Sequence, residues 1–184
     1  MLEAAFLDAN LFVPTWTLDA FLSLAEARAY EPFWSDKIME EARVAIQEVR
    51  QVSKQQAQQV LDAANKAFPM ALTQGWETLE QDIALPDIDD RHVLAAARLA
   101  GAQTIVTFNL KHFPQSALAP VGLEVQSPDA FLSRMYDGAP ELCGQAMRDL
   151  VNSKHHPPRT MQEEIEHLNR IGLPVFARRL AETN

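Results

Sequence analysis

The chain has little cysteine and no long apolar run. Its single cysteine, Cys143, excludes an internal disulfide framework and fits a reducing cytosol, so we interpret the thiol as structural. No apolar stretch approaches the roughly 18 residues that a membrane-spanning helix needs, and no basic region precedes an apolar run at the N-terminus. We therefore expect a soluble, cytoplasmic protein that does not bind a membrane.

Positive charge is also scarce. The 184 residues include 16 Lys and Arg against 25 Asp and Glu, a net charge of −9, which argues against broad nucleic-acid binding through surplus basic side chains. Residues 1–142 hold 10 basic and 20 acidic side chains, whereas residues 143–184 hold 6 and 5. The acidity belongs to the larger N-terminal part, although solubility alone explains such a composition equally well.

Short apolar runs separated by helical patterns indicate a parallel sheet covered by helices. Runs at 4–7 and 102–107 each end near a polar side chain, Asp8 and Asn109 respectively, and further strands are expected at 123–125 and just before Ser35. No glycine-rich loop follows the first run, which argues against a phosphate-binding nucleotide fold.

Capping hydroxyls mark three helices. Ser53, Ser127 and Thr160 each precede a helical pattern, which predicts helices to about residues 68, 136 and 172. Breaks around Gly138 and Pro140 divide the chain into a domain at 1–137 and a C-terminal helical extension at 138–184 that packs on it.

The extension carries an apolar stripe and several cations. Met161, Ile165 and Leu168 fall on one helical face, which we expect to pack on the domain. Basic side chains would then ring the domain, available to RNA or to an acidic peptide, although solvated basic faces are an equally good interpretation. These side chains are Lys154, Arg159, Arg170, Arg178 and Arg179.

Asp8 and Glu41 are two candidate site residues. Asp8 follows the first strand, at the edge of the sheet where ligands bind in α/β folds, but it is equally suited to cap a helix. A helical projection of residues 35–52 places Glu41 at the border of the apolar face and Glu40 in solvent. The alternative for Glu41 is a boundary residue paired with a Lys or Arg.

Asp90 is the third candidate and lies in a dense acidic segment. Asp87 or Asp89 can cap the helix that follows and Gly101 can end it, which leaves Asp90 in the first turn, in line with the apolar stripe. A lone carboxylate there is costly unless a cation shares the site, although an over-capped helix start is the simpler explanation. Together, three carboxylates and an amide suit Mg²⁺, which prefers oxygen ligands and can activate water for phosphodiester hydrolysis.

Four segments resemble the signatures of PIN domains, particularly the VapC-type toxins of bacterial toxin-antitoxin pairs. They are LDAN at 7–10, IMEEAR at 38–43, DIDDRHVLAAARLAGAQ at 87–103 and IVTFNLKHFP at 105–114, and the resemblance covers about residues 3–130. It implies a three-layer α/β/α fold with a central parallel sheet and extra C-terminal helices. It also implies Mg²⁺ or Mn²⁺ bound by Asp8, Glu41 and Asp90, cleavage of RNA, frequent homodimers and a cognate antitoxin protein.

The fourth segment departs from the family pattern. Asn109 stands where many PIN domains have an aspartate, and His112 stands where an acid is often found. An amide can coordinate a cation or position water without supplying charge, so Asn109 joins the expected catalytic set and a second metal is in doubt. We interpret His92 and His112 as hydrogen-bonded structural residues rather than ligands.

Two other functions remain open. A phosphohydrolase with an aspartyl nucleophile would want a second aspartate two residues after Asp8, where this chain has Asn10. An inactive PIN domain that acts as a scaffold is the stronger alternative, because Asn109 removes a charge from the site.

Overall fold

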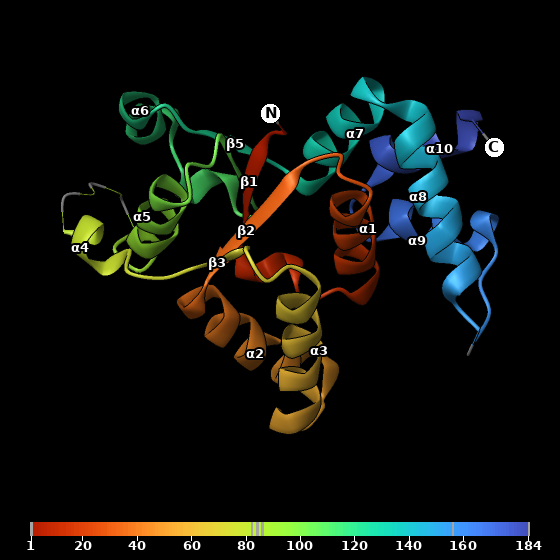
Figure 1. The fold of residues 1–184 in the computed structure, drawn as a ribbon, viewed down its shortest axis with the longest axis horizontal. Coiled ribbons are helices and arrows are strands. Elements are labelled where there is room, and N and C mark those ends of the chain that lie inside the picture. Colours follow the sequence, from red (N-terminus) through yellow and green to blue (C-terminus); the bar gives the residue numbers. More distant parts are fainter. Residues whose placement is uncertain (1, 82, 84, 86, 156, 184) are drawn as a thin grey trace.

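A five-stranded parallel sheet forms the centre of the molecule, with strand order β3-β2-β1-β4-β5 (Figure 1). The computed structural model describes residues 2–81, 83, 85, 87–155 and 157–183. The strands are β1 (Ala4–Leu7), β2 (Glu31–Ser35), β3 (Leu72–Thr73), β4 (Thr104–Val106) and β5 (Glu124–Gln126). The predicted strands are confirmed, with β5 one residue later than expected, whereas β3 was not predicted.

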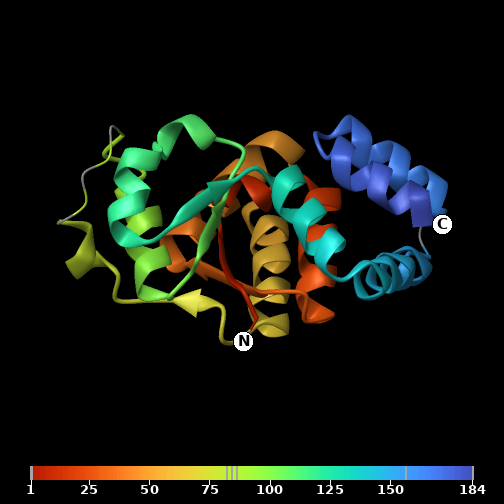
Figure 2. The same ribbon diagram turned by 90° about the horizontal axis from the view of Figure 1, so that it is seen from above.

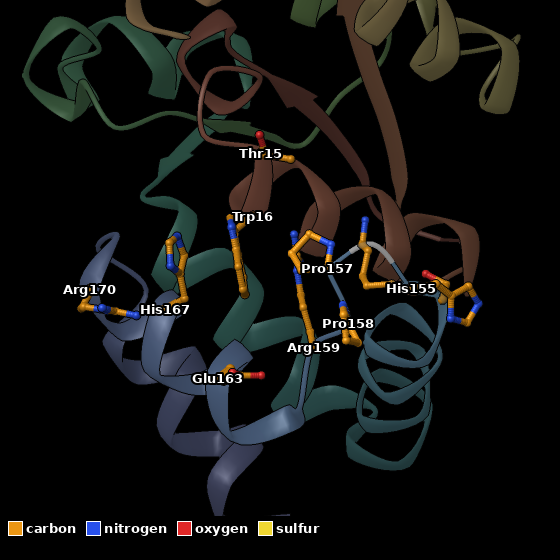
Figure 3. A pocket seen from close by; sticks show the side chains of 11 residues that line it. Thr15, Trp16, His155, Pro157, Pro158, Arg159, Glu163, His167 and Arg170 are labelled. Atoms are coloured by element: carbon orange, nitrogen blue, oxygen red, sulfur yellow. The ribbon is translucent and has the colours of Figure 1, made fainter.

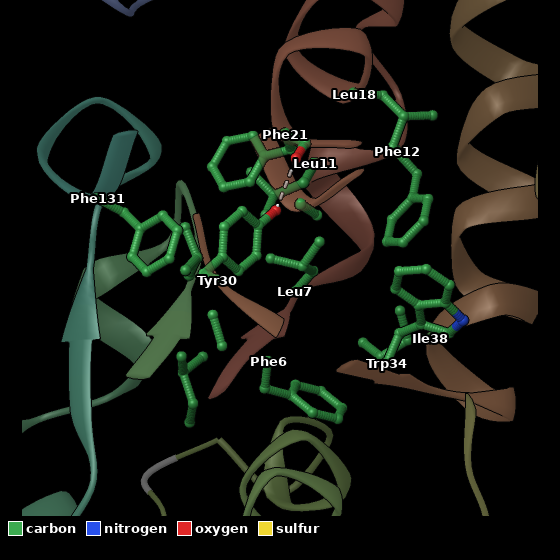
Figure 4. Close-up of a cluster of buried hydrophobic side chains, with 14 of the residues drawn as sticks. Phe6, Leu7, Leu11, Phe12, Leu18, Phe21, Tyr30, Trp34, Ile38 and Phe131 are labelled. Atoms are coloured by element: carbon green, nitrogen blue, oxygen red, sulfur yellow. Dashed lines mark hydrogen bonds between the residues drawn. The ribbon is translucent and has the colours of Figure 1, made fainter. Parts of the chain in front are cut away.

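Helices cover both faces of the sheet, which gives the three-layer α/β/α arrangement that the sequence predicts. In Figure 2, α5 lies on one side of the sheet, and α1 and α7 lie on the other. The two faces are visible in the side chains of β1, where Phe6 points toward α5 and Leu7 points toward Phe21 of α1 (Figure 4). Both are fully buried, so β1 anchors two apolar layers at once.

The helices begin where the capping residues predict. Ser53 and Thr160 each form a capping box, and the Ser127 hydroxyl accepts a hydrogen bond from the Ala130 N–H. The longer helices are α1 (Thr15–Glu26), α2 (Asp36–Arg50), α3 (Lys54–Ala67), α5 (Arg91–Leu99), α7 (Pro128–Gly138), α8 (Pro140–Ser153), α9 (Met161–Arg170) and α10 (Pro174–Thr183). Short turns complete the chain at α4 (Glu77–Glu80), α6 (Gln115–Leu118), η1 (Ala9–Leu11), η2 (Leu110–His112) and η3 (Ala119–Val121).

The last three helices lie against the rest of the fold. In Figure 1, α8 lies beside α1, and α10 packs on α7 and α9. Leu168 of the predicted apolar stripe is fully buried, and Met161 and Ile165 are partly buried against the same core. The Asp129 carboxylate of α7 accepts hydrogen bonds from the Val175 and Phe176 N–H groups at the start of α10. The division of the chain at residue 138 stays a prediction.

A buried polar cluster joins the extension to α1. The Arg159 Nη1 atom lies 3.1 Å from a Glu164 carboxylate oxygen and 3.4 Å from an Asp19 oxygen, and Lys154 Nζ lies 2.8 Å from Asp19. Glu164 is fully buried, and this burial raises the pKa of its carboxyl group against the opposing effect of Arg159. Arg159 therefore holds two acids from two different helices.

Among the residues described, no helix is both long and apolar enough to cross a membrane.

Candidate active site

Asp8 lies at the carboxyl edge of the sheet, where β1 and β4 end side by side. Its N–H donates to the Val106 carbonyl at 3.1 Å, which extends the β1–β4 pairing by one residue. Its side chain accepts hydrogen bonds from the Thr107 hydroxyl at 2.6 Å, the Asn10 amide at 2.7 Å and the Ala9 N–H at 2.7 Å. Asp8 therefore caps η1, which is the alternative that the sequence left open. It is also held by Thr107, which directly follows the neighbouring strand β4.

Two other acidic side chains affect the pKa of Asp8. Burial raises the pKa of the Asp8 carboxyl group, and the negative charges of Asp90 and Glu41 raise it further. The hydrogen bonds from Thr107 and Ala9 act in the opposite direction. Asp90 and Glu41, which are distant from Asp8 in sequence, thus lie near enough for their charges to act on it, and the joint role of the three carboxylates stays a prediction.

Glu40 and Glu41 point to different surroundings, as the helical projection predicts. Glu40 is exposed and forms an ion pair with Arg43, one turn along α2. Glu41 is paired instead with His92 of α5, whose Nε2 atom lies 3.0 Å from the carboxylate. The His92 ring is buried beside Trp76, so the partner of Glu41 is a fixed imidazole and not the Lys or Arg of the alternative interpretation.

Asp90 contacts a second histidine. His112 Nδ1 lies 2.6 Å from Asp90 Oδ2 and 3.8 Å from Asp87 Oδ2. Within the described parts of the chain, these three residues form the group whose ligand atoms lie close enough together for one metal ion, within 4.8 Å of one another. The prediction that His112 is hydrogen-bonded is confirmed, but its partner is Asp90, a candidate metal ligand.

The start of α5 differs from the sequence prediction. Asp87 accepts a hydrogen bond from the Asp89 N–H, so its oxygen closes a local turn two residues on rather than capping the helix. Asp90 stands at the N-cap position, one residue before Arg91, and its side chain makes no capping bond. Its carboxylate is therefore turned to His112 and not to the helix backbone. Gly101 ends the helix as predicted, with φ of +68°.

Asn109 lies on the exposed rim of this edge. Its N–H donates to the Thr107 hydroxyl at 2.9 Å, the same hydroxyl that donates to Asp8. Thr107 is fully buried and links the two segments, whereas its sequence context predicts only the end of a strand. Its position as the first polar residue after β4, opposite Asp8, is the signal that could have identified it.

Comparison with known proteins agrees with this geometry. The PIN domain family matches residues 4–111, more than half of the chain. The chain belongs to the PIN domain family. A second family, described as the VapC50 C-terminal domain, matches residues 128–182, which include the helical extension.

One curated relative adds to these family matches. The chain is 40% identical over 88 residues to "Putative ribonuclease VapC50" of Mycobacterium tuberculosis, an overlap of 48% of this chain and 52% of that protein. The chain thus aligns with about half the length of this relative. No solved structure matches the chain.

The donor set of this PIN domain suits a hard divalent cation. Asp8, Glu41 and Asp90 carry carboxylate oxygens, the kind of ligand that such a cation prefers. The Asn10 amide is already engaged, since its nitrogen donates to Asp8 and Thr107 and its oxygen accepts from the Phe108 N–H. The buried position of Asp8 beside two other negative charges is unfavourable without a cation, as its raised pKa indicates. The acidic groups present therefore fit a divalent cation.

The raised pKa of Asp8 predicts a pH-dependent stability. A carboxyl group whose pKa is raised by folding stabilises the folded state below its usual pKa, and this contribution is lost as the pH rises through the raised value. We expect the metal-free wild type to lose stability relative to Asp8→Asn over the pH range that begins at about 4, the usual pKa of an aspartate, and extends upward through the raised pKa. Urea unfolding in EDTA across this range measures the difference, and a difference that does not change with pH would contradict it.

Proposed function

We propose that this chain is a metal-dependent ribonuclease of the VapC type, which hydrolyses phosphodiester bonds of RNA at the edge formed by β1, β4, α2 and α5. Asp8, Glu41 and Asp90 are the metal ligands in this proposal, and Asn109 orients water or substrate at the rim. The observation that carries this proposal is the environment of Asp8. Its carboxylate is buried, accepts hydrogen bonds from Thr107 and Asn10, and lies near enough to Glu41 and Asp90 for their charges to raise its pKa.

Each residue has a role that its contacts support. Thr107 and Asn10 both donate hydrogen bonds to Oδ2 of Asp8, which fixes the orientation of this side chain. His92 orients Glu41 from α5, and His112 orients Asp90 from η2. When bound, Mg²⁺ or Mn²⁺ would lower the pKa of a bound water. The ion would also supply the positive charge that an acidic protein lacks and that stabilises the developing phosphorane.

The direct test of this function is RNA cleavage by the purified chain. We expect cleavage of single-stranded RNA with Mg²⁺ or Mn²⁺ and none with excess EDTA. Metal binding without cleavage of any RNA tested would contradict the proposal and favour the inactive scaffold that Asn109 suggests.

The adjacent glutamates of α2 provide a matched pair of variants. Glu41→Gln is expected to lower the cleavage rate by roughly a hundredfold or more, because it removes a charged ligand from the site. Glu40→Gln makes the same chemical change on the exposed side of α2 and should leave the rate unchanged, since its partner is Arg43. Single-turnover cleavage rates decide this, and a loss in Glu40→Gln alone would mean that α2 presents its other face to RNA.

We further propose that a cognate antitoxin restrains the enzyme in the bacterial cytoplasm and that the chain forms a homodimer, as VapC-type toxins do. The VapC50 relative and the VapC50 C-terminal family support this proposal by likeness. An antitoxin helix or extended segment could lie over the acidic edge and place a basic side chain among its carboxylates. Induced expression in a bacterial host should slow growth, and normal growth with confirmed folded protein would count against the toxin role.

A further inference from the structure

A cavity of about 750 Å³ lies between the start of α1 and the C-terminal extension (Figure 3). Thr15 and Trp16 line it from α1, residues 153–155 and 157–159 line another side, and Glu163, His167 and Arg170 line it from α9. It therefore exists only because the extension packs on the PIN domain.

Stacked rings form one wall of this cavity. The Trp16 ring stacks on His167 with centroids 4.0 Å apart, and the Arg159 guanidinium carbon lies 3.5 Å from the Trp16 centroid on the other side (Figure 3). Burial lowers the pKa of His167, with the charges of Arg170 and Arg159 acting in the same direction, so the imidazole is neutral at physiological pH. The Trp16 ring is thus covered on one face by His167 and on the other by Arg159.

Arg170 supplies the available positive charge. Arg159 is held by Asp19 and Glu164, and Lys154 is held by Asp19. The Arg170 Nε atom donates to the Glu166 carbonyl, and no carboxylate of the described residues forms an ion pair with its guanidinium group. An arginine with free donors beside an aromatic wall can bind a phosphate while a base or ribose packs on the rings.

The end of α9 lies beside the loop that follows β4 and leads to Asn109. Arg170 lies two residues before Gly172, where an added Cβ would lie 3.8 Å from the Phe108 ring. The Phe108 N–H donates to the Asn10 side chain at 3.3 Å, and Asn10 donates to Asp8. The end of α9 that carries Arg170 is therefore near the loop whose backbone is hydrogen-bonded to Asn10.

We propose that this cavity binds a nucleotide of the single-stranded RNA substrate outside the bond that is cleaved. Arg170 contacts a phosphate, and the Trp16–His167 stack packs against the sugar or base of that nucleotide. This inference rests on the proposed function, because the acidic edge around Asp8 repels phosphates and the enzyme needs a cationic contact nearby to hold its substrate.

The test measures binding of a short fluorescein-labelled oligouridylate to the full chain by anisotropy, in EDTA and over a range of salt concentrations. Arg170→Ala should weaken binding about tenfold and lower the slope of log affinity against log salt by about 0.7, the effect of one lost phosphate contact on a single strand. Arg170→Lys should recover most of the affinity. Arg178→Ala removes an equally exposed arginine of the extension that lies outside the cavity and should change neither quantity.

Equal RNA binding by wild type and Arg170→Ala would overturn the inference, as would equal losses in Arg170→Ala and Arg178→Ala. An acidic peptide that binds more tightly than RNA and depends on Arg170 would also overturn it, by making the cavity a protein-docking site. The KM for RNA cleavage, measured on the same preparations, separates the two proposals. Cleavage with an unchanged KM in Arg170→Ala contradicts the subsite alone, whereas a wild type that cleaves no RNA contradicts the proposed function.

Discussion

The Asp90→Asn variant is expected to lose metal-dependent RNA cleavage by roughly a thousandfold while it stays folded. Asparagine keeps the shape of the side chain and an oxygen that can accept a hydrogen bond from His112, but it removes one of the negative charges that act on Asp8. Without metal, the variant should be as stable as the wild type or more so, because less repulsion remains at the edge of the sheet.

Thermal unfolding beside the cleavage assay measures both effects. Mg²⁺ should raise the melting temperature of the wild type, because the ion binds only the assembled site, and should raise that of Asp90→Asn much less. A variant that unfolds in the absence of metal would show that Asp90 is a structural residue of the α5 start. Full activity in a folded variant would remove Asp90 from the site.

The Arg159→Met variant is expected to lower the free energy of unfolding by about 3 kcal/mol. Methionine keeps much of the apolar stem, but it removes the guanidinium group that lies over Trp16 and leaves Glu164 buried without its cation. The cost arises from this stranded carboxylate, whose pKa is already raised by burial, so it should diminish at acidic pH as Glu164 becomes protonated.

Chemical denaturation of three variants separates this cause from lost packing. Adding Glu164→Gln to Arg159→Met should recover much of the lost stability, because the double variant buries no unpaired charge. Arg178→Met changes an exposed arginine of α10 and should have little effect. A loss in Arg159→Met that is the same at all pH values and is not relieved by Glu164→Gln would contradict this explanation.

Local patterns were sufficient to predict the strands and helices that position the site. The apolar run before Asp8 predicted β1, and the helical period placed Glu41 and Glu40 on different sides of α2. Capping residues located α3, α7 and α9 because each cap acts within three residues of the backbone that it satisfies. By contrast, β3 has two residues and no apolar alternation, so no local pattern indicated it.

Contacts between distant segments could not be predicted in the same way. His112 meets Asp90 across 22 positions, and Thr107 meets Asp8 across 99, so neither pairing follows from spacing along one helix or strand. The same limit explains why Asp87 or Asp89 was predicted to cap α5, since the place of Asp87 beside His112 depends on how the two segments pack. The cavity around Trp16 likewise requires three separate segments to come together.

The central claim concerns which side chains hold the metal, and an anomalous difference map from a crystal soaked in Mn²⁺ tests it most directly. The structure offers two sets of ligands that share Asp90: the proposed set with Asp8 and Glu41, and the compact group with Asp87 and His112. We predict a peak in contact with the carboxylates of Asp8, Glu41 and Asp90. A peak bound by Asp87 and His112 without Asp8, or no peak at this edge of the sheet, would contradict the account.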